Sequence, residues 1–74
     1  MRGKITRVVE SGNFSMYLIW LSESNSFART YTGSGYRNYT NWKDLKVGDF
    51  VQGLEWKDLS RKILDADSPV HPID

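Results

Sequence analysis

Three successive stretches in the first half of the chain have the hydrophobic pattern of β-strands. Residues 4–10 are rich in β-branched side chains and end at residues 11–13 (Ser-Gly-Asn), a sequence typical of a tight turn. Residues 15–21 are apolar at nearly every position, as in a central strand that is covered on both faces. Residues 26–32 alternate strictly and follow a polar break at residues 22–25. The pattern predicts three consecutive strands.

The pattern changes in the second half of the chain. A glycine-rich turn and an aromatic, basic segment occupy residues 33–39, which are expected to form a loop. Asn41 can cap a helical turn that Gly48 closes, so a short helix is predicted between them. Two further strands are predicted over residues 49–57 and 61–65. The sequence thus predicts an all-β fold with a small α content.

The order of three strands, a short helix and two more strands resembles the OB fold, a five-stranded β-barrel with a helix between strands three and four. Residues 45–54, a short basic stretch followed by Gly-Asp and an apolar strand, are also similar to the start of the fourth strand in many OB domains. Gly53 within this strand indicates a bulge or a tight barrel bend. The resemblance implies one OB-like barrel over residues 1–67, followed by an extended, proline-containing C-terminal tail over residues 68–74.

Large apolar side chains have to fill so small a barrel, and some of the aromatic residues must therefore be core. The expected core consists of Ile5, Val9, Ile19, Leu21, Phe50, Val51, Leu54 and Ile63. Because Ile19 and Leu21 already supply a core face, Trp20 is expected at the surface, although Tyr17 shares their parity and could equally be the exposed ring. Trp42 and Trp56 fit two roles, plugging an end of the barrel or stacking on a base.

The chain length of 74 residues suffices for one domain with a small core, and cysteine is absent. Disulfides, thiolate catalysis and cysteine-based zinc sites are therefore excluded. No apolar run approaches the roughly 20 residues of a membrane-spanning helix, and residues 1–6 lack the apolar segment of a signal peptide. We expect no membrane association and a cytoplasmic location.

Residues that could support catalysis are few. His71 is the only histidine, and it lies between prolines without a serine or an acid in a triad order. Asp65 and Asp67 could share a strand face, as a carboxylate pair or a hard-metal site requires, but two acids near a strand end are more often solvated. Residues 33–35 (Gly-Ser-Gly) lack the lysine of a phosphate-binding loop. We expect a protein that is not an enzyme, with no cofactor and no metal ion.

Two neighbouring segments interleave aromatic and basic residues: Phe27, Arg29 and Tyr31, then Tyr36, Arg37 and Tyr39. An arginine between two core positions is costly unless it is paired, so the side of the strand that carries Arg29 is expected to be exposed. The alternative is that the two rings face the core and the arginine reaches past them. Single-stranded nucleic acid needs both residue types, because bases stack on flat rings while Arg and Lys hold the backbone. The OB resemblance implies that strands two and three form the binding platform, where these residues fall.

The expected function is single-stranded DNA binding by base stacking and phosphate contacts, with RNA as a variant. The expected site comprises Trp20, Phe27, Arg29, Tyr31, Tyr36, Arg37 and Tyr39, supported by Lys4, Arg7 and Trp56. The charge distribution favours this function, because residues 1–47 carry seven Lys and Arg against three acids, whereas residues 48–74 carry three against six.

A protein-interaction module is the alternative. The formal net charge of +1 is low for a tight electrostatic binder of nucleic acid. An OB or SH3-like barrel could use the same aromatic surface, or an exposed strand edge, to bind a protein partner or a second copy of itself.

Overall fold

The computed structural model describes residues 1–33, 42 and 44–73, over which the fold is all-β with almost no helix. The strands in chain order are β1 (Arg2–Ser11), β2 (Phe14–Leu21), β3 (Ser26–Gly33), β4 (Phe50–Gln52), β5 (Trp56–Asp58), β6 (Ile63–Leu64) and β7 (His71–Pro72). The three strands predicted in the first half are present, and each is slightly longer than expected. The second half holds short strands instead of the two longer ones predicted.

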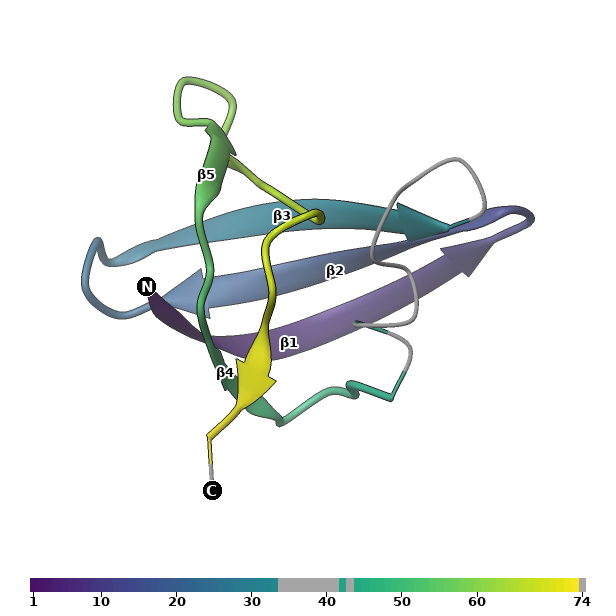
Figure 1. Ribbon diagram of the computed structural model, residues 1–74, viewed down its shortest axis with the longest axis horizontal. Helices are drawn as coiled ribbons and strands as arrows, with labels where there is room; N and C mark the ends of the chain where they lie inside the picture. The colour runs from purple at the N-terminus through teal and green to yellow at the C-terminus, as the bar shows by residue number, and fades with distance from the viewer. Residues whose placement is uncertain (34–41, 43, 74) are drawn as a thin grey trace.

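All these strands belong to one sheet in the order β5-β6-β3-β2-β1-β4-β7. Neighbouring strands are antiparallel except β3 and β6, which are parallel. Only residues 53–55 separate β4 from β5 along the chain, yet these two strands lie toward opposite edges of the sheet. The sheet must therefore curl until its two edges come close, and it forms a half-barrel. In Figure 1, β4, β5 and the C-terminal segment cross in front of the three long strands.

A β-bulge in β1 exchanges the two faces of that strand. Ile5 pairs with Ile19, but the next pair is Arg7 with Leu18, so Thr6 is an extra residue in the ladder. The Thr6 hydroxyl donates a hydrogen bond of 3.1 Å to the carbonyl of Leu18 at this point. Beyond the bulge the parity of β1 is reversed, which directs Arg7 away from the core. The bulge also explains why Val9, predicted in the core, is only half-buried: Val8 packs against the core in its place.

The core lies between the three long strands and the segments that cross them. Its buried members are Ile5, Tyr17, Ile19, Leu21, Ala28, Trp42, Leu45, Val51, Leu54, Leu64 and Val70. The prediction was right for Ile5, Ile19, Leu21, Val51 and Leu54. Tyr17 is the buried ring of β2. Its hydroxyl donates a buried hydrogen bond of 2.9 Å to the carbonyl of Trp42. Trp42 itself is fully buried.

Two expected core residues of the second half lie elsewhere. Phe50 is 53% exposed, because Val51 takes the inward position of the short strand β4. Ile63 is half-buried, because Leu64 takes the inward position of β6. In strands of two or three residues, one shift of parity decides which side chain is buried.

The strand predicted over residues 49–57 is broken into β4 and β5 at Gly53. Gly53 has a φ of 87°, which an L side chain rarely adopts, and a Cβ there would lie 2.5 Å from the carbonyl oxygen of Pro69. The bent segment is held against the start of β1, because the backbone of Leu54 donates to the carbonyl of Met1 at 3.2 Å. The chain therefore bends at Gly53, as the sequence suggested, and the strand is interrupted there.

The segment predicted as a C-terminal tail is extended, but it belongs to the body of the protein. Ser68 and Val70 are buried, and β7 pairs with β4 in the sheet. The amide of Ile73 donates to the carbonyl of Phe50 at 2.8 Å. Residues 68–73 therefore cover one end of the core rather than extending from a barrel that ends at residue 67.

The short helix predicted between Asn41 and Gly48 is not established. Residues 41 and 43 lie outside the described residues, and residues 44–49 form turns and irregular chain. No described segment is a helix with the length and hydrophobicity that a membrane crossing requires.

Candidate functional site

The three long strands present one side to the core and the other to solvent, and we call the solvent side the outer face. In β3, buried Ala28, Thr30 and Thr32 alternate with residues that point outward. The side that carries Arg29 is thus the exposed one, as expected. The register of the strands gives the members of the outer face: Arg2, Lys4, Arg7 and Val9 of β1, Phe14, Met16, Leu18 and Trp20 of β2, and Phe27, Arg29 and Tyr31 of β3.

A row of aromatic side chains crosses the strands at one end of the outer face. In register, Phe27 lies opposite Trp20, Trp20 opposite Lys4, and Lys4 opposite Phe50 of β4. We call these three rings, together with the lysine between two of them, the aromatic row. The rings of Trp20 and Phe27 meet edge to face with centroids 4.8 Å apart. The ammonium of Lys4 lies 5.4 Å from the centroid of the Phe50 ring. Phe27 is 50% exposed, so much of this row is open to a ligand.

Two arginines lie next to the aromatic row. Arg29 pairs with Leu18, and Leu18 pairs with Arg7, so the two guanidinium groups flank an apolar residue on the same face. Residues two apart on a strand are separated by about 6.6–6.8 Å, which places Arg29 directly beside Phe27. Both arginines are exposed, and neither has a carboxylate partner within the described part of the chain. Their charges are therefore available to an anionic ligand.

The opposite end of the outer face is apolar. Tyr31 is half-buried, and its ring meets that of Phe14 at a centroid distance of 6.1 Å in an edge geometry. Met16 lies opposite Tyr31, and Val9 lies opposite Met16. Tyr31 is therefore part of the same face as Phe27 and Arg29, but it contacts Phe14 rather than the aromatic row.

A basic hollow borders the aromatic row on the side of β6. Its volume is about 240 Å³, and it is lined by Leu18, Phe27, Ala28, Arg29, Arg61 and Lys62. The turn between β5 and β6 supplies the last two residues, because β6 pairs with β3 and the amide of Arg29 donates to the carbonyl of Lys62 at 3.0 Å. Three basic residues therefore line one site beside Phe27, with the Arg61 guanidinium 3.5 Å from the Asp58 carboxylate and the Lys62 ammonium over the Trp56 ring.

Asp58 holds the turn that carries Arg61 and Lys62. Its carboxylate accepts hydrogen bonds from the hydroxyl of Ser60 at 2.7 Å and from the amides of Ser60 and Arg61 at 3.1 and 3.3 Å. The guanidinium of Arg61 lies 3.5 Å away. The hydroxyl of Ser60, followed by the Arg61 amide and charge, lowers the pKa of Asp58 below its ordinary value of 3.8. Asp58 is therefore ionised at neutral pH and fixes the turn beside β3.

The structure brings together six of the predicted site residues on the outer face: Lys4, Arg7, Trp20, Phe27, Arg29 and Tyr31. Trp56 is not with them. It lies on β5, which β6 separates from β3, and its half-buried ring packs against the core with Lys62 over it at 5.6 Å. The predicted residues Tyr36, Arg37 and Tyr39 lie outside the described residues.

Sequence reasoning missed three residues of this surface. Phe50 was assigned to the core, while Arg61 and Lys62 were not assigned to any site. The pairing of β4 with β1 and of β6 with β3 brings them to the outer face. The charge of Arg61 and Lys62 was a usable signal, but only the pairing of β6 shows where they lie.

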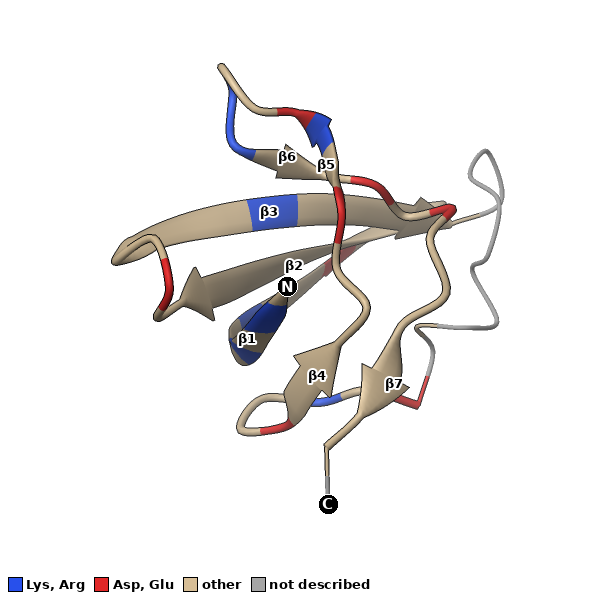
Figure 2. Cartoon of the chain, turned by 60° about the vertical axis from the view of Figure 1, so that its left-hand side comes forward, with Lys and Arg blue, Asp and Glu red and all other residues tan. Residues whose placement is uncertain are grey.

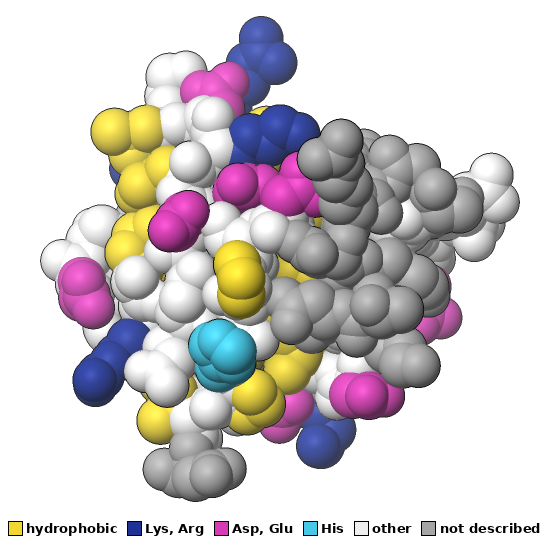
Figure 3. Space-filling model, in the orientation of Figure 1, with side chains coloured by type: hydrophobic (Ala, Val, Ile, Leu, Met, Phe, Trp, Pro, Cys, Tyr) yellow, Lys and Arg dark blue, Asp and Glu magenta, His cyan; other side chains and the backbone are white. Residues whose placement is uncertain are grey.

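The charged side chains of the outer face are all basic. Basic positions lie on β1, on β3 and in the turn before β6, and the acids of β1–β3 supply no member of the outer face (Figure 2). Figure 3 shows the side of the crossing segments, where acidic and basic side chains are interspersed over the surface. Within residues 1–33, 42 and 44–73, no three His, Asp or Glu side chains gather as metal ligands would.

Comparisons of the chain with protein-family models, with curated proteins and with solved structures gave no match. A function for this chain is therefore inferred from the geometry of its outer face.

Proposed function

We propose that this chain is an OB-type domain that binds single-stranded DNA on its outer face. The observation that carries the proposal is the exposed Phe27 ring, paired edge to face with Trp20 and flanked by Arg29, which has no carboxylate partner among the residues that the structure describes. Flat rings offer a stacking surface for bases, and the neighbouring guanidinium groups offer partners for phosphates. Single-stranded RNA has the same two features and is a variant of the same proposal.

The strand connections support the OB-type barrel. If β4 and β5 are counted as one strand bent at Gly53, and β7 as an addition at the edge, five strands remain. The bent strand then pairs with β1 through β4 and with β6 through β5, which joins the two sides of the curled sheet. A five-stranded barrel in which one face of the central strands is open to a ligand is the arrangement of OB domains.

Stacking and a few phosphate contacts fit the charge of this protein better than binding by charge alone. Stacking contributes about 1–3 kcal/mol for each base and does not depend on the base identity. Arg2, Lys4, Arg7 and Arg29 offer four cations on the face, which predicts a slope of about −3 for the logarithm of affinity against the logarithm of salt concentration. The affinity is therefore expected to depend only moderately on salt.

Titration of oligo-dT into the protein, followed by tryptophan fluorescence at several salt concentrations, tests the proposal. We expect quenching that weakens as salt rises. Phe27→Ala is expected to weaken binding about 5- to 150-fold, which corresponds to one lost stacking contact. Arg29→Ala is also expected to weaken binding and to reduce the salt slope by about 0.7.

Two exposed residues away from the outer face provide matched controls. Lys57→Ala removes a cation of β5, and Val47→Ala truncates an apolar side chain that is 58% exposed. Both variants are expected to bind as the wild type does. A flat titration of the wild type at low salt would contradict the proposal and would favour protein binding by the same exposed rings.

A further inference from the structure

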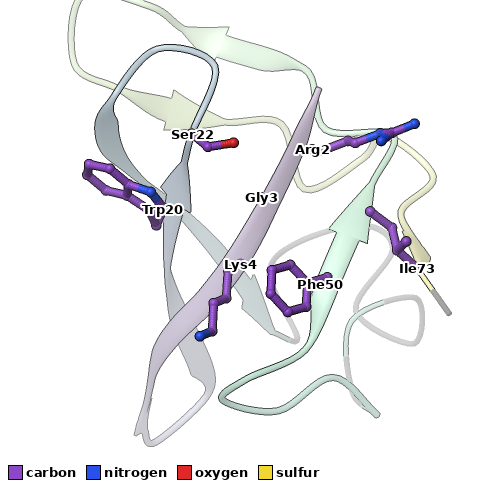
Figure 4. A pocket seen from close by; sticks show the side chains of 7 residues that line it. All are labelled: Arg2, Gly3, Lys4, Trp20, Ser22, Phe50 and Ile73. Carbon is purple, nitrogen blue, oxygen red and sulfur yellow. The ribbon is translucent and has the colours of Figure 1, made fainter.

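A second hollow lies at the other end of the aromatic row, between Trp20 and Phe50 (Figure 4). Its volume is about 300 Å³. Trp20 and Ser22 line it from one side, and Phe50 and Ile73 line it from the other. The backbone of β1 at Gly3 runs between them. We call this hollow the Trp20–Phe50 pocket.

Two cations accompany the apolar walls of this pocket. Arg2 and Lys4 extend from β1 on either side of Gly3, and none of the lining residues in the described part of the chain is Asp or Glu. Lys4 lies in register between Trp20 and Phe50, so the pocket is continuous with the aromatic row. A ligand for this site therefore combines a flat apolar group with a negative charge a short distance away.

We propose that the Trp20–Phe50 pocket receives one base of the bound DNA, taken out of the stack, with the adjoining phosphate at Arg2 or Lys4. This inference rests on the proposed function and adds to it a defined position for one nucleotide. A base offers a flat apolar group to the aromatic walls, and the attached phosphate offers an anionic partner to Arg2 or Lys4. The hydroxyl of Ser22 can donate to or accept from a base edge.

Other ligand classes fit the pocket less well. An apolar side chain of a protein partner would fill the walls but would make no use of the charges of Arg2 and Lys4. An isolated phosphate ion would meet the cations but would make no use of Trp20 and Phe50. A nucleotide meets both requirements at once.

The C-terminal segment also contributes to the Trp20–Phe50 pocket. Ile73 forms part of the pocket wall, and its amide is bonded to the carbonyl of Phe50 at 2.8 Å. The segment that covers the core thus also completes a binding site.

The test combines a protein variant with a DNA variant. Phe50→Ala removes one wall, and an abasic nucleotide removes the base that would enter. The probe is oligo-dT of about eight nucleotides, compared with a set of the same length in which each position in turn is abasic. We expect Phe50→Ala to weaken binding of oligo-dT about 5- to 150-fold. We also expect one abasic position to weaken binding to the wild type but to have no further effect on Phe50→Ala.

Ser22→Leu provides a second variant that keeps both walls. Ser22 is exposed in the turn after β2, so a larger side chain there is expected to fill the pocket without disturbing the core. Ser22→Leu should weaken binding as Phe50→Ala does, whereas Val47→Ala should retain both the affinity and the abasic effect.

The outcomes separate this inference from the proposed function. If the wild type binds oligo-dT and the two pocket variants bind equally well, the pocket assignment is wrong while the outer face remains the binding surface. The same conclusion follows if the abasic effect persists in Phe50→Ala. If the wild type does not bind oligo-dT at low salt, both proposals are wrong.

Discussion

The two faces of β1, β2 and β3 differ in character, although neighbouring residues form them. The inner face carries Ile5, Tyr17, Ile19 and Ala28, all of which are buried. The outer face carries cations and rings at the intervening positions, and Phe27 among them is 50% exposed. Because successive side chains of a strand point to opposite faces, the same strands can hold the fold together and present a binding surface. Stability and binding should therefore be separable by mutations at adjacent positions.

The largest expected contrast lies between Ile19 and its neighbour Leu18. Ile19 is fully buried and lies between Ile5 and Ala28 in the sheet, whereas Leu18 is half-buried on the outer face. Ile19→Ala should lower the free energy of unfolding by about 2–5 kcal/mol, because it leaves a cavity in a core that cannot collapse completely. Urea denaturation gives this value. An equal loss in Leu18→Ala would contradict the assignment of the two faces.

The second contrast compares two tyrosines. The Tyr17 hydroxyl donates to the buried carbonyl of Trp42, whereas the Tyr31 hydroxyl has no hydrogen-bond partner within the part of the chain that the structure describes. Tyr17→Phe should cost about 0.5–1.5 kcal/mol, because it removes a buried hydrogen bond and leaves the Trp42 carbonyl with the Leu45 amide as its donor. Tyr31→Phe should change stability by no more than about 0.5 kcal/mol. Thermal or urea unfolding of both variants tests this difference, and a costly Tyr31→Phe would contradict it.

The third contrast compares the effect of one substitution, Phe27→Ala, on stability with its effect on binding. Phe27→Ala should lower stability by only about 0.5–1.5 kcal/mol, since it removes the edge contact with Trp20 and no buried packing. Its effect on oligo-dT affinity should be at least as large as its effect on stability. Unfolding and binding measured on the same sample provide the comparison, and a variant that unfolds readily would show that Phe27 is structural.

The smallest expected effect concerns the turn that carries Arg61 and Lys62. The Ser60 hydroxyl lowers the pKa of Asp58, so the contribution of Asp58 to stability is present above its unfolded pKa and is lost as pH falls through its folded pKa. Asp58→Asn should therefore be slightly less stable than the wild type at neutral pH, and the difference should vanish in acid. A difference that persists at low pH would show that the carboxylate charge is not what anchors the turn.

The first half of the fold could be predicted from the sequence because its strands are long. Each of the three strands has enough residues for an alternation to be read, and each pairs with neighbours in the sheet. The exposed side of β3 also followed from the sequence, since Arg29 between two core positions would be costly. The bulge at Thr6 could not be anticipated, because it depends on the pairing of β1 with β2.

The second half could be predicted only in outline. Gly53 indicated a bend, but its contact with Pro69 shows that the packing of a distant segment fixes the break between β4 and β5. Phe50 was misplaced because β4 is too short for its parity to be evident from the sequence. For the same reason the sequence did not indicate the Trp20–Phe50 pocket, which requires the pairing of β4 with β1 and of β7 with β4.

The three tryptophans allow the most direct test of the binding surface. Trp20 lies on the outer face, Trp42 is fully buried, and Trp56 packs against the core on β5. Their indole N–H signals can be followed separately by nuclear magnetic resonance while oligo-dT is added at low salt. Binding on the outer face predicts a large shift of the Trp20 signal and smaller shifts of the other two. A Trp20 signal that stays in place throughout the titration would contradict the central claim.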